Sequence, residues 1–346
     1  VPPCRLNCIS NDNLGLSQSA VWQAEFFAGF SDRPLPALGS TSSRLLCGDS
    51  EYHQSLEHSL SSAYQRASLL FNSGYHANIG FLPALADKHT LILADKLVHA
   101  SLIDGIRLAG CDYRRFRHND MAQLARLLDE HAERYRLIII VSESIFSMDG
   151  DFAPLAEMVA LKKQYDHVWL YLDEAHAIGV HGQNGLGLAE QQGVLSDIDL
   201  LIGTFGKAAA SIGAYLICDE VIKDYLINTM RPLIFSTALP PLNIAWSEFV
   251  FRRLPQCGDK RAHLANISHT LRQAIAQRGL PMPSQSNVVP YITGSNASAE
   301  QLAEQLQAQG CYALPIRPPT VPGNTARLRF SLTAAMTDEE IEWLIS

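Results

Sequence analysis

The sequence lacks several features that define whole classes of protein. It has 346 residues, a formal charge of −8 and no basic run with which to neutralise the phosphates of a nucleic acid. No apolar run reaches the ~18 residues of a membrane span, and the first residues do not resemble a signal peptide. Charged residues make up only 18% and apolar residues 47%, so we expect a large core and neither a nucleic-acid nor a membrane partner.

Paired cysteines are also missing. The seven cysteines are scattered, and none forms a C-x-x-C motif. This usage is typical of reduced thiols in a cytoplasmic protein. No Cys/His pair at zinc spacing accompanies Cys4 and Cys8, and His176 and His181 have no third ligand nearby in the sequence. We therefore expect no metal site.

What the sequence does contain is an alternation of short apolar runs with helical stretches. The runs are apolar throughout, as in strands that are covered on both faces. The pattern predicts an α/β fold, with a mostly parallel sheet and helices on both of its faces. The expected strands are Ser68–Phe71, Thr90–Ala94, Leu137–Val141, Val168–Leu172, Leu200–Gly203 and Ala214–Cys218. The helical stretches between several of them are Tyr52–Tyr64, Leu102–Ala109, Met121–His131 and Pro154–Tyr165.

The pattern changes after about Pro240, where helical segments begin to dominate. A capping box at Thr337-Asp-Glu-Glu340 predicts the start of the closing helix. We expect an N-terminal segment over 1–44, a large domain over 45–239 and a smaller α+β domain over 240–346. The elements expected in the last domain are helices over Asn243–Arg253, Arg261–Arg278 and Ala299–Gln309 and strands over Val288–Thr293 and Arg327–Leu332.

Ligands of open α/β sheets bind at the carboxyl ends of strands, and an acid, a histidine and a lysine follow two of the expected strands. Asp173 and His176 follow one strand, and Lys207 follows the next in Gly-Thr-Phe-Gly-Lys. A pyridoxal-phosphate enzyme needs such a set, with the lysine as Schiff base and the acid on the pyridinium nitrogen. Taken alone, Asp173 also suits a helix N-cap and Lys207 a solvated loop. The lysine segment is not a phosphate-binding P-loop, because Leu201 and Ala208 break that motif.

The chain resembles the α-oxoamine synthases, a family of fold-type I pyridoxal-phosphate enzymes. The resemblance runs from Ser10-Asn-Asp-Asn-Leu-Gly-Leu16 nearly to the C-terminus. The segments that carry it are Leu97-Val-His-Ala-Ser-Leu102, Arg114-Arg-Phe-Arg-His-Asn-Asp120, Phe146–Asp151, Asp173–Gly179, Thr204–Lys207, Ile316-Arg-Pro-Pro-Thr-Val-Pro322 and Thr325-Ala-Arg-Leu-Arg329. Together these motifs are highly specific, although no single one would suffice.

The resemblance implies a role for each matching residue. Lys207 carries the cofactor and acts as the base, Asp173 pairs with the ring nitrogen, and His99 stacks over the ring. The implied contacts to the ring oxygen come from His176 and Ser147, those to the phosphate from Gly74, Tyr75, Thr204 and Thr237, and those to substrate from Asn11, Thr320, Arg329 and more weakly Arg317. Thr237 is expected to reach a neighbouring subunit's cofactor, which implies a homodimer with sites at the interface.

The implied reaction is the decarboxylative condensation of L-alanine with a pimeloyl thioester, on CoA or an acyl carrier protein, in biotin biosynthesis. Two alternatives remain open from the residues. One is a sister acyltransferase, such as a glycine C-acetyltransferase, and the other is a cofactor-binding protein without turnover.

Three positions depart from the family's glycine pattern. Thr41 and Ser42 stand where the family usually has glycine, and Ala210 lies in the usually glycine-rich stretch after the lysine. Since glycine is the residue that adopts positive φ without strain, these replacements restrict the backbone there. The usual Asn-Asp-Tyr also reads Asn11-Asp12-Asn13, and only ten residues precede Asn11. The family usually has a longer N-terminal arm before this motif, so we expect the arm either to lie outside these 346 residues or to be absent, and the loops on the acyl-donor side to be altered.

Overall fold

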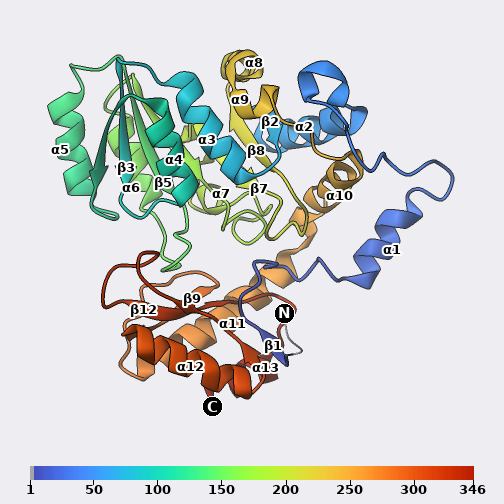
Figure 1. Cartoon of the computed structure of the whole chain (residues 1–346), viewed down its shortest axis with the longest axis vertical. Helices are drawn as coiled ribbons and strands as arrows, with labels where there is room; N and C mark the ends of the chain where they lie inside the picture. Colours follow the sequence, from blue (N-terminus) through green and yellow to red (C-terminus); the bar gives the residue numbers. More distant parts are fainter. Residues whose placement is uncertain (1–3) are drawn as a thin grey trace. The chain divides into compact units, whose positions relative to one another are not determined.

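The computed structural model describes residues 4–346, and its chain divides into two compact units (Figure 1). The large unit contains residues 17–144 and 153–255. The small unit contains residues 4–16, 145–152 and 256–346. The division into 1–44, 45–239 and 240–346 stays a prediction of domain organisation.

A seven-stranded sheet forms the centre of the large unit, in the order β2-β8-β7-β6-β5-β3-β4. All neighbours from β7 to β4 are parallel, whereas β8 is antiparallel to both β7 and β2. Its strands are β2 Ala67–Phe71, β3 Thr90–Asp95, β4 Asp112–Phe116, β5 Leu137–Glu143, β6 Val168–Asp173, β7 Leu200–Thr204 and β8 Ala214–Cys218. All six strands expected from apolar runs are present, and the predicted α/β class is confirmed.

Strand β4 has no counterpart among the predicted strands. Its sequence Asp-Tyr-Arg-Arg-Phe is polar, and the first four of its residues are exposed. It lies at the edge of the sheet and pairs with β3 alone. An edge strand needs no apolar surface on both faces, and its charged side chains discourage pairing with other chains, so an apolar-run criterion misses it.

Helices pack against both faces of this sheet (Figure 1). Helices α3 and α4 approach closely at Gly105 of α4, which has no side chain. A Cβ there would lie 2.3 Å from the carbonyl oxygen of Asn78 in α3. The helices are α1 Ala20–Ala28, α2 Glu51–Tyr64, α3 Gly74–Leu85, α4 Ala100–Ala109, α5 Met121–His131, α6 Leu155–Lys162, α7 Leu188–Gln191, α8 Glu220–Thr229, α9 Arg231–Ile234 and α10 Pro241–Phe251. Short turns of π or 3₁₀ type occupy Arg44–Gly48, Leu195–Asp197 and Leu254–Gln256.

The small unit contains a three-stranded antiparallel sheet in the order β11-β12-β9 and a two-stranded parallel pair, β1 and β10. The capping box predicted for the last helix is confirmed by reciprocal bonds between Thr337 and Glu340. The strands are β1 Leu6–Asn7, β9 Val288–Gly294, β10 Cys311–Tyr312, β11 Pro315–Ile316 and β12 Ala326–Ser331, and the helices are α11 Gly258–Gln277, α12 Asn296–Ala308 and α13 Asp338–Ile345. Across residues 4–346, no helix is long and apolar enough to cross a membrane.

Candidate active site

Three strands of the large unit bring polar side chains to one edge of the sheet. Glu143, the last residue of β5, pairs in register with Asp173, the last residue of β6, and Asp173 pairs with Ile202 of β7. Lys207 follows β7 by three residues. Because these strands are parallel, their carboxyl ends coincide, and the acid and the lysine predicted from the sequence belong to the same edge.

Asp173 is a carboxylate with only 6% exposure. Its Oδ2 accepts a hydrogen bond of 2.9 Å from Asn78 Nδ2, and its Oδ1 accepts one of 2.9 Å from the backbone of Ala175. Both donors are neutral, so they orient the carboxylate without neutralising it. A protonated ring nitrogen is a ligand that would complete this environment, since buried carboxylates are normally paired with a cation.

His99 caps the N-terminus of α4 and is itself exposed. Its Nδ1 accepts from the backbone N–H of Ser101 at 3.2 Å and lies 2.8 Å from the Ser101 hydroxyl. Desolvation lowers the pKa of the ring, and the positive charge of Lys207 lowers it further, against the opposing effect of Asp173. The result is a neutral, oriented ring that suits the stacking role expected for it.

Glu143 belongs to the same edge, although the residue pattern gave it no role. It has 4% exposure, and its Oε1 finds no hydrogen-bond partner among residues 4–346. Burial and the neighbouring Asp173 raise the pKa of its carboxyl, whereas Lys207 and a hydrogen bond from the backbone of His99 oppose that rise. Polar residues at the end of an apolar run were the available signal, since Ser142 and Glu143 end β5 and Ser144 follows it.

The N-terminus of α3 offers backbone N–H groups to an anion such as a phosphate. Ser73 caps it by accepting from His76, and the position of a Cβ on Gly74 is open, with nothing within 4 Å. Tyr75 is exposed and donates to Asp104 at 2.6 Å. The expected phosphate contacts Gly74 and Tyr75 therefore lie together at an accessible helix end.

Thr204 and Thr237, the other two expected phosphate contacts, are placed by different bonds. Thr204 ends β7 and its hydroxyl donates to Gly213 at 3.0 Å. Thr237 is exposed, and its carbonyl accepts from Asn72, the residue before the Ser73 cap, at 2.7 Å. Its expected reach to a neighbouring subunit stays a prediction.

His176 lies in the turn that follows β6 and is 6% exposed. Glu174, which is fully buried, holds that turn to α7 by accepting from the backbone of Leu188 at 3.0 Å and of Ala189 at 2.7 Å. The hydroxyl of Ser144 donates to it as well, at 2.6 Å. Burial raises the pKa of Glu174 to about 7 despite these bonds. The turn carrying His176 is thus fixed by a residue with no predicted role.

In the small unit, Arg329 of β12 is a charged residue with a buried, unused hydrogen-bond donor. Its Nη2 donates to Asn11 Oδ1 at 3.2 Å, while its Nε is buried and has no partner among residues 4–346. Burial lowers the pKa of its guanidinium to about 10. A buried guanidinium with an unused donor fits a carboxylate ligand, which would accept two parallel hydrogen bonds.

The small unit holds three more residues with an expected role, which are Ser147, Thr320 and Arg317. Ser147 is half-buried in a turn that closes with a bond from Gly150 to the Phe146 carbonyl. Gly150 needs its positive φ of 70°, and a Cβ there would meet the Val288 carbonyl oxygen at 2.0 Å. Thr320 is exposed and donates its backbone N–H to Arg317, which is paired with Glu300. Within this unit, the structure joins Asn11 to Arg329 but leaves Thr320 on a surface loop.

The profile of the family described as aminotransferase class I and II matches residues 6–346. The chain belongs to this family. It is 58% identical to the 8-amino-7-oxononanoate synthase of Haemophilus ducreyi, over 99% of this chain and 90% of that protein.

Two solved structures share the fold of the whole chain. A serine palmitoyltransferase of S. paucimobilis with bound PLP has a TM-score of 0.91 and 28% identity, covering 98% of this chain and 85% of that one. The 8-amino-7-oxononanoate synthase of Francisella tularensis has a TM-score of 0.83 and 27% identity, covering 98% and 95%. The resemblance found in the sequence, and the fold-type I class it implied, are confirmed.

Two of the departures from the family's glycine pattern have a clear structural consequence. Thr41 has a φ of 51° and Ala210 a φ of 50°, so both hold left-handed backbone that favours glycine. Each lies in a loop that is held by contacts with other parts of the large unit. In the loop of Ala210, the Ala210 carbonyl accepts a hydrogen bond of 3.0 Å from Trp246. Ser42, the third replacement, is not among the residues with positive φ.

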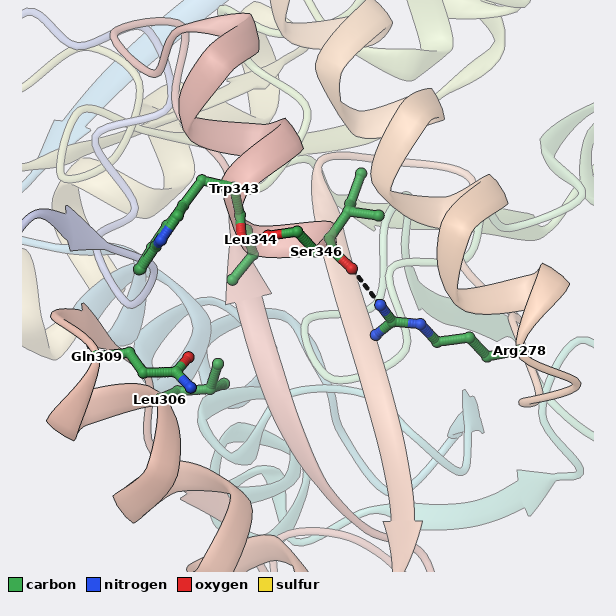
Figure 2. Close-up of a pocket in the computed structure, with 7 residues that line it drawn as sticks. Arg278, Leu306, Gln309, Trp343, Leu344 and Ser346 are labelled. Carbon is green, nitrogen blue, oxygen red and sulfur yellow. Dashed lines mark hydrogen bonds between the residues drawn. The ribbon is translucent and has the colours of Figure 1, made fainter.

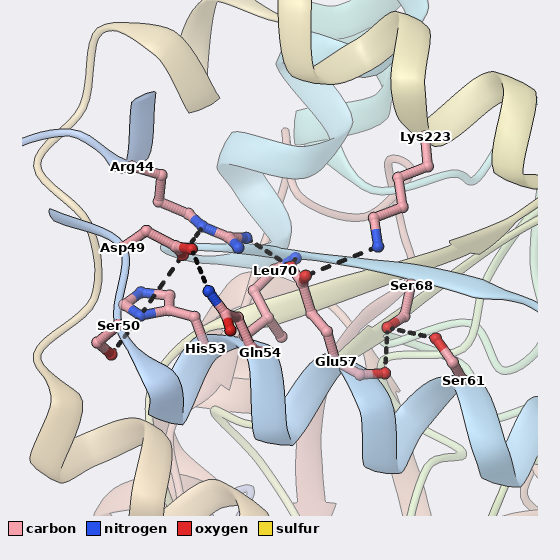
Figure 3. Close-up of polar contacts among 10 residues, drawn as sticks. All are labelled: Arg44, Asp49, Ser50, His53, Gln54, Glu57, Ser61, Ser68, Leu70 and Lys223. Atoms are coloured by element: carbon pink, nitrogen blue, oxygen red, sulfur yellow. Dashed lines mark hydrogen bonds and ion pairs between the residues drawn. The ribbon is translucent and has the colours of Figure 1, made fainter. Parts of the chain in front are cut away.

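The segment that follows Thr41 is anchored by a partly buried ionic network (Figure 3). Arg44 contacts Asp49 at 2.8 Å and Glu57 at 2.5 Å. Glu57, 7% exposed, also accepts from the backbone of Leu70 in β2 at 3.0 Å. His53 lies beside this network at 1% exposure, with its Nδ1 2.9 Å from the hydroxyl of Ser50. The network ties the loop bearing Thr41 to the central sheet.

A separate cavity of about 330 Å³ lies in the small unit against α13 (Figure 2). Arg278 borders it and donates to the carbonyl of Ile345, and Trp343 and Leu306 form other parts of its wall. It offers no nucleophile or acid–base pair. Over residues 4–346, no three His, Cys, Asp or Glu side chains come together in a way that could hold a metal ion.

Proposed function

We propose that this protein is a pyridoxal-phosphate-dependent acyltransferase that condenses L-alanine with a pimeloyl thioester. The products are 8-amino-7-oxononanoate, carbon dioxide and the free thiol, and the reaction belongs to biotin biosynthesis. The relatives named above support this reaction, at 58% identity over nearly the whole chain in one case. The observation that carries the proposal is that the carboxyl ends of the parallel strands bring buried Asp173 and Glu143 together with Lys207 and His99.

The residues present fit the cofactor. Asp173 offers a buried carboxylate to the ring nitrogen, and the open N-terminus of α3 at Gly74 and Tyr75 offers N–H groups to the phosphate. Thr204 and Thr237 would add phosphate contacts, and His176 and Ser147 would donate to the ring oxygen. When bound, pyridoxal phosphate supplies a ring that accepts the electron pair left by bond cleavage at the amino-acid α-carbon.

The chain's own residues bind and move the proton. Lys207 Nζ would hold the cofactor, and it would remove the α-proton of the amino acid and later return one. Asp173 would hold a proton on the ring nitrogen. His99 would stack on the ring, and its lowered pKa favours the uncharged form beside Lys207.

Substrate binding is assigned to the small unit. Arg329 would hold the carboxylate of alanine through its unused Nε and its Nη2, assisted by Asn11. Thr320 is also proposed to contact substrate. It is exposed on a loop, and binding residues are often found on loops.

The assembly is proposed to be a homodimer with active sites at the interface. Large apolar side chains are exposed on the large unit, including Leu38 at 79%, Leu46 at 81% and Phe235 at 71%, and exposed apolar patches commonly mark interfaces. The acyl donor is proposed to be carried by CoA or by an acyl carrier protein. The free cysteines support a cytoplasmic location.

Trapping and substrate selection test this proposal together. Reduction of the purified holoenzyme with borohydride should fix the cofactor on a peptide containing Lys207, and Lys207→Ala should abolish that adduct. Turnover should then require L-alanine and a pimeloyl thioester, on CoA or on an acyl carrier protein, in a panel that also contains glycine, serine, acetyl-CoA and palmitoyl-CoA. Preference for glycine with acetyl-CoA would indicate the sister acyltransferase. An adduct without turnover on any pair would contradict the synthase assignment.

A further inference from the structure

Asn78 is a polar residue on the apolar helix α3, and it is 1% exposed. Its Nδ2 donates to Asp173 Oδ2 at 2.9 Å and to Ser101 Oγ at 2.9 Å. Its Oδ1 accepts from the hydroxyl of Tyr171 at 2.5 Å. Both protons of the amide and its oxygen are therefore in use, and the side chain touches both Asp173 and the residue that holds His99.

These bonds fix the direction of every donor in the group. A flipped amide would aim its oxygen at the Asp173 carboxylate, so the observed orientation is the one that carries no repulsion. Because Ser101 Oγ accepts from Asn78, its own proton is available for His99 Nδ1 at 2.8 Å. The same Nδ1 accepts the Ser101 backbone N–H. His99 Nδ1 is consequently an acceptor, and the ring proton resides on Nε2.

We propose that Asn78 is a positioning residue that couples Asp173 to His99, orienting the carboxylate with one amide proton and fixing the His99 tautomer through Ser101 with the other. The proposal rests on the proposed function, which places Asp173 on the ring nitrogen and His99 on the ring face. The charged groups whose fields reach His99 are Asp173, Lys207 and Asp104, and Glu143 accepts its backbone N–H.

The packing of α3 on α4 keeps this link short. Gly105 lies one turn beyond Ser101 on α4, and the Asn78 carbonyl oxygen occupies the space that its Cβ would need. Helices held this closely leave little freedom for the amide to withdraw from Ser101. The sequence shows no motif for this arrangement, because it depends on how two helices meet.

The test measures separately, in the holoenzyme, the effect of the Asn78 bond to Asp173 and the effect of its bond to Ser101. The first readout is the His99 tautomer, from ¹⁵N-histidine NMR with the His99 signal assigned by its loss in His99→Gln. The second is the dissociation constant of pyridoxal phosphate. Asn78→Ala should convert a single Nε2–H tautomer into a mixture and weaken cofactor binding about tenfold or more, as expected when a positioning contact is lost.

Ser101→Ala should alter the tautomer but leave cofactor affinity within about twofold, because the Asn78 bond to Asp173 remains. Ser268→Ala is the matched control: Ser268 is also a helical serine with 1% exposure, and it should change neither readout. If Asn78→Ala does not fold, Asn78→Leu replaces it, because an apolar side chain of similar size can donate to neither Asp173 nor Ser101.

Movement of both readouts in the Asn78 variants, and of the tautomer alone in Ser101→Ala, supports the coupling. An unchanged tautomer or an unchanged affinity in the Asn78 variants overturns it. Neither readout requires turnover, so inactivity toward alanine and pimeloyl-CoA would contradict the proposed function without deciding the role of Asn78.

Discussion

Asp173 and Arg329 are both charged groups that are shielded from solvent, but they differ in the hydrogen bonds that the protein gives them. Asp173 in the large unit is held by two hydrogen bonds of 2.9 Å from neutral donors. Arg329 in the small unit has one bond of 3.2 Å to Asn11 and a buried Nε with no partner among residues 4–346. The protein alone therefore orients Asp173, whereas Arg329 still has a charged donor available for a ligand.

This difference indicates which ligand each unit receives. A cofactor stays bound through many turnovers, so a carboxylate fixed in advance costs little reorganisation. A substrate must enter and leave, and a guanidinium with unused capacity gains its best bonds only when an anion arrives. We therefore propose that permanent binding belongs to the large unit and exchangeable binding to the small one, and the following predictions test that division.

The largest effect is expected for Asp173→Asn. An amide cannot neutralise a protonated ring nitrogen, and breaking a buried charge pair costs about 3–5 kcal/mol, or about 10²- to 10⁴-fold in rate. We expect kcat to fall by that amount in steady-state assays. The borohydride adduct at Lys207 should persist, because the covalent link does not involve Asp173. A variant with normal kcat would remove Asp173 from the cofactor site.

Arg329→Lys should act on the substrate instead. A lysine keeps the charge but loses the planar pair of donors, which is worth about 1.5–3 kcal/mol for a charge-assisted bond, or about 10- to 100-fold. We expect the KM for alanine to rise by that factor while cofactor affinity is unchanged. Arg272→Lys is the control, since this arginine contacts the Ser286 carbonyl and should leave the KM alone. A loss of cofactor affinity in Arg329→Lys would contradict the division.

The large unit is expected to lose stability at low pH through His53, which lies in the network of Figure 3. Burial and the adjacent Arg44 lower the pKa of His53 from 6.5 to about 4. A histidine with a depressed pKa stabilises the fold above pH 6.5, and that contribution is lost as the pH falls toward 4. Between pH 8 and pH 5 the loss is about 2 kcal/mol.

Urea denaturation of the wild type and of His53→Gln at the two pH values measures this loss. The variant lacks the titrating group, so its stability should depend less on pH by that amount. Equal pH dependence in both proteins would mean that another group controls the acid sensitivity.

The smallest effects are expected at the two strained positions of the large unit. Thr41→Gly and Ala210→Gly should each raise the free energy of unfolding by about 0.5–1 kcal/mol, because glycine relieves left-handed strain at some cost in chain entropy. Gly110→Ala is the matched reverse change, with a φ of 64° and open space around its Cβ, and should destabilise by a similar amount. Destabilisation by the two glycines would show that their side chains make compensating contacts.

The sequence predicted the parts of this molecule that depend on local patterns. Continuous apolar runs located six strands of the central sheet, and the residues after two of them gave Asp173 and Lys207. Strand β4 was missed because an edge strand carries no such run. Thr41 and Ala210 were noticed only as departures from a family pattern, and their positive φ came from the structure.

The missing parts of the candidate site depend on tertiary register. Glu143 becomes adjacent to Asp173 only when β5 and β6 align, and Asn78 reaches Ser101 only because α3 and α4 meet at Gly105. No spacing in the chain encodes either contact. The unused Nε of Arg329 likewise depends on what surrounds β12, although the residue itself was found by resemblance.

The most direct test of the central claim follows the carboxyl carbon of alanine. The holoenzyme is incubated with L-alanine labelled with ¹³C at C1, with and without pimeloyl-CoA, and the products are measured by mass spectrometry. We predict equal amounts of ¹³CO₂ and unlabelled 8-amino-7-oxononanoate, both requiring the thioester and both lost in Lys207→Ala. Conversion of alanine to pyruvate with C1 retained would instead show amino-group transfer, and would contradict the proposed condensation.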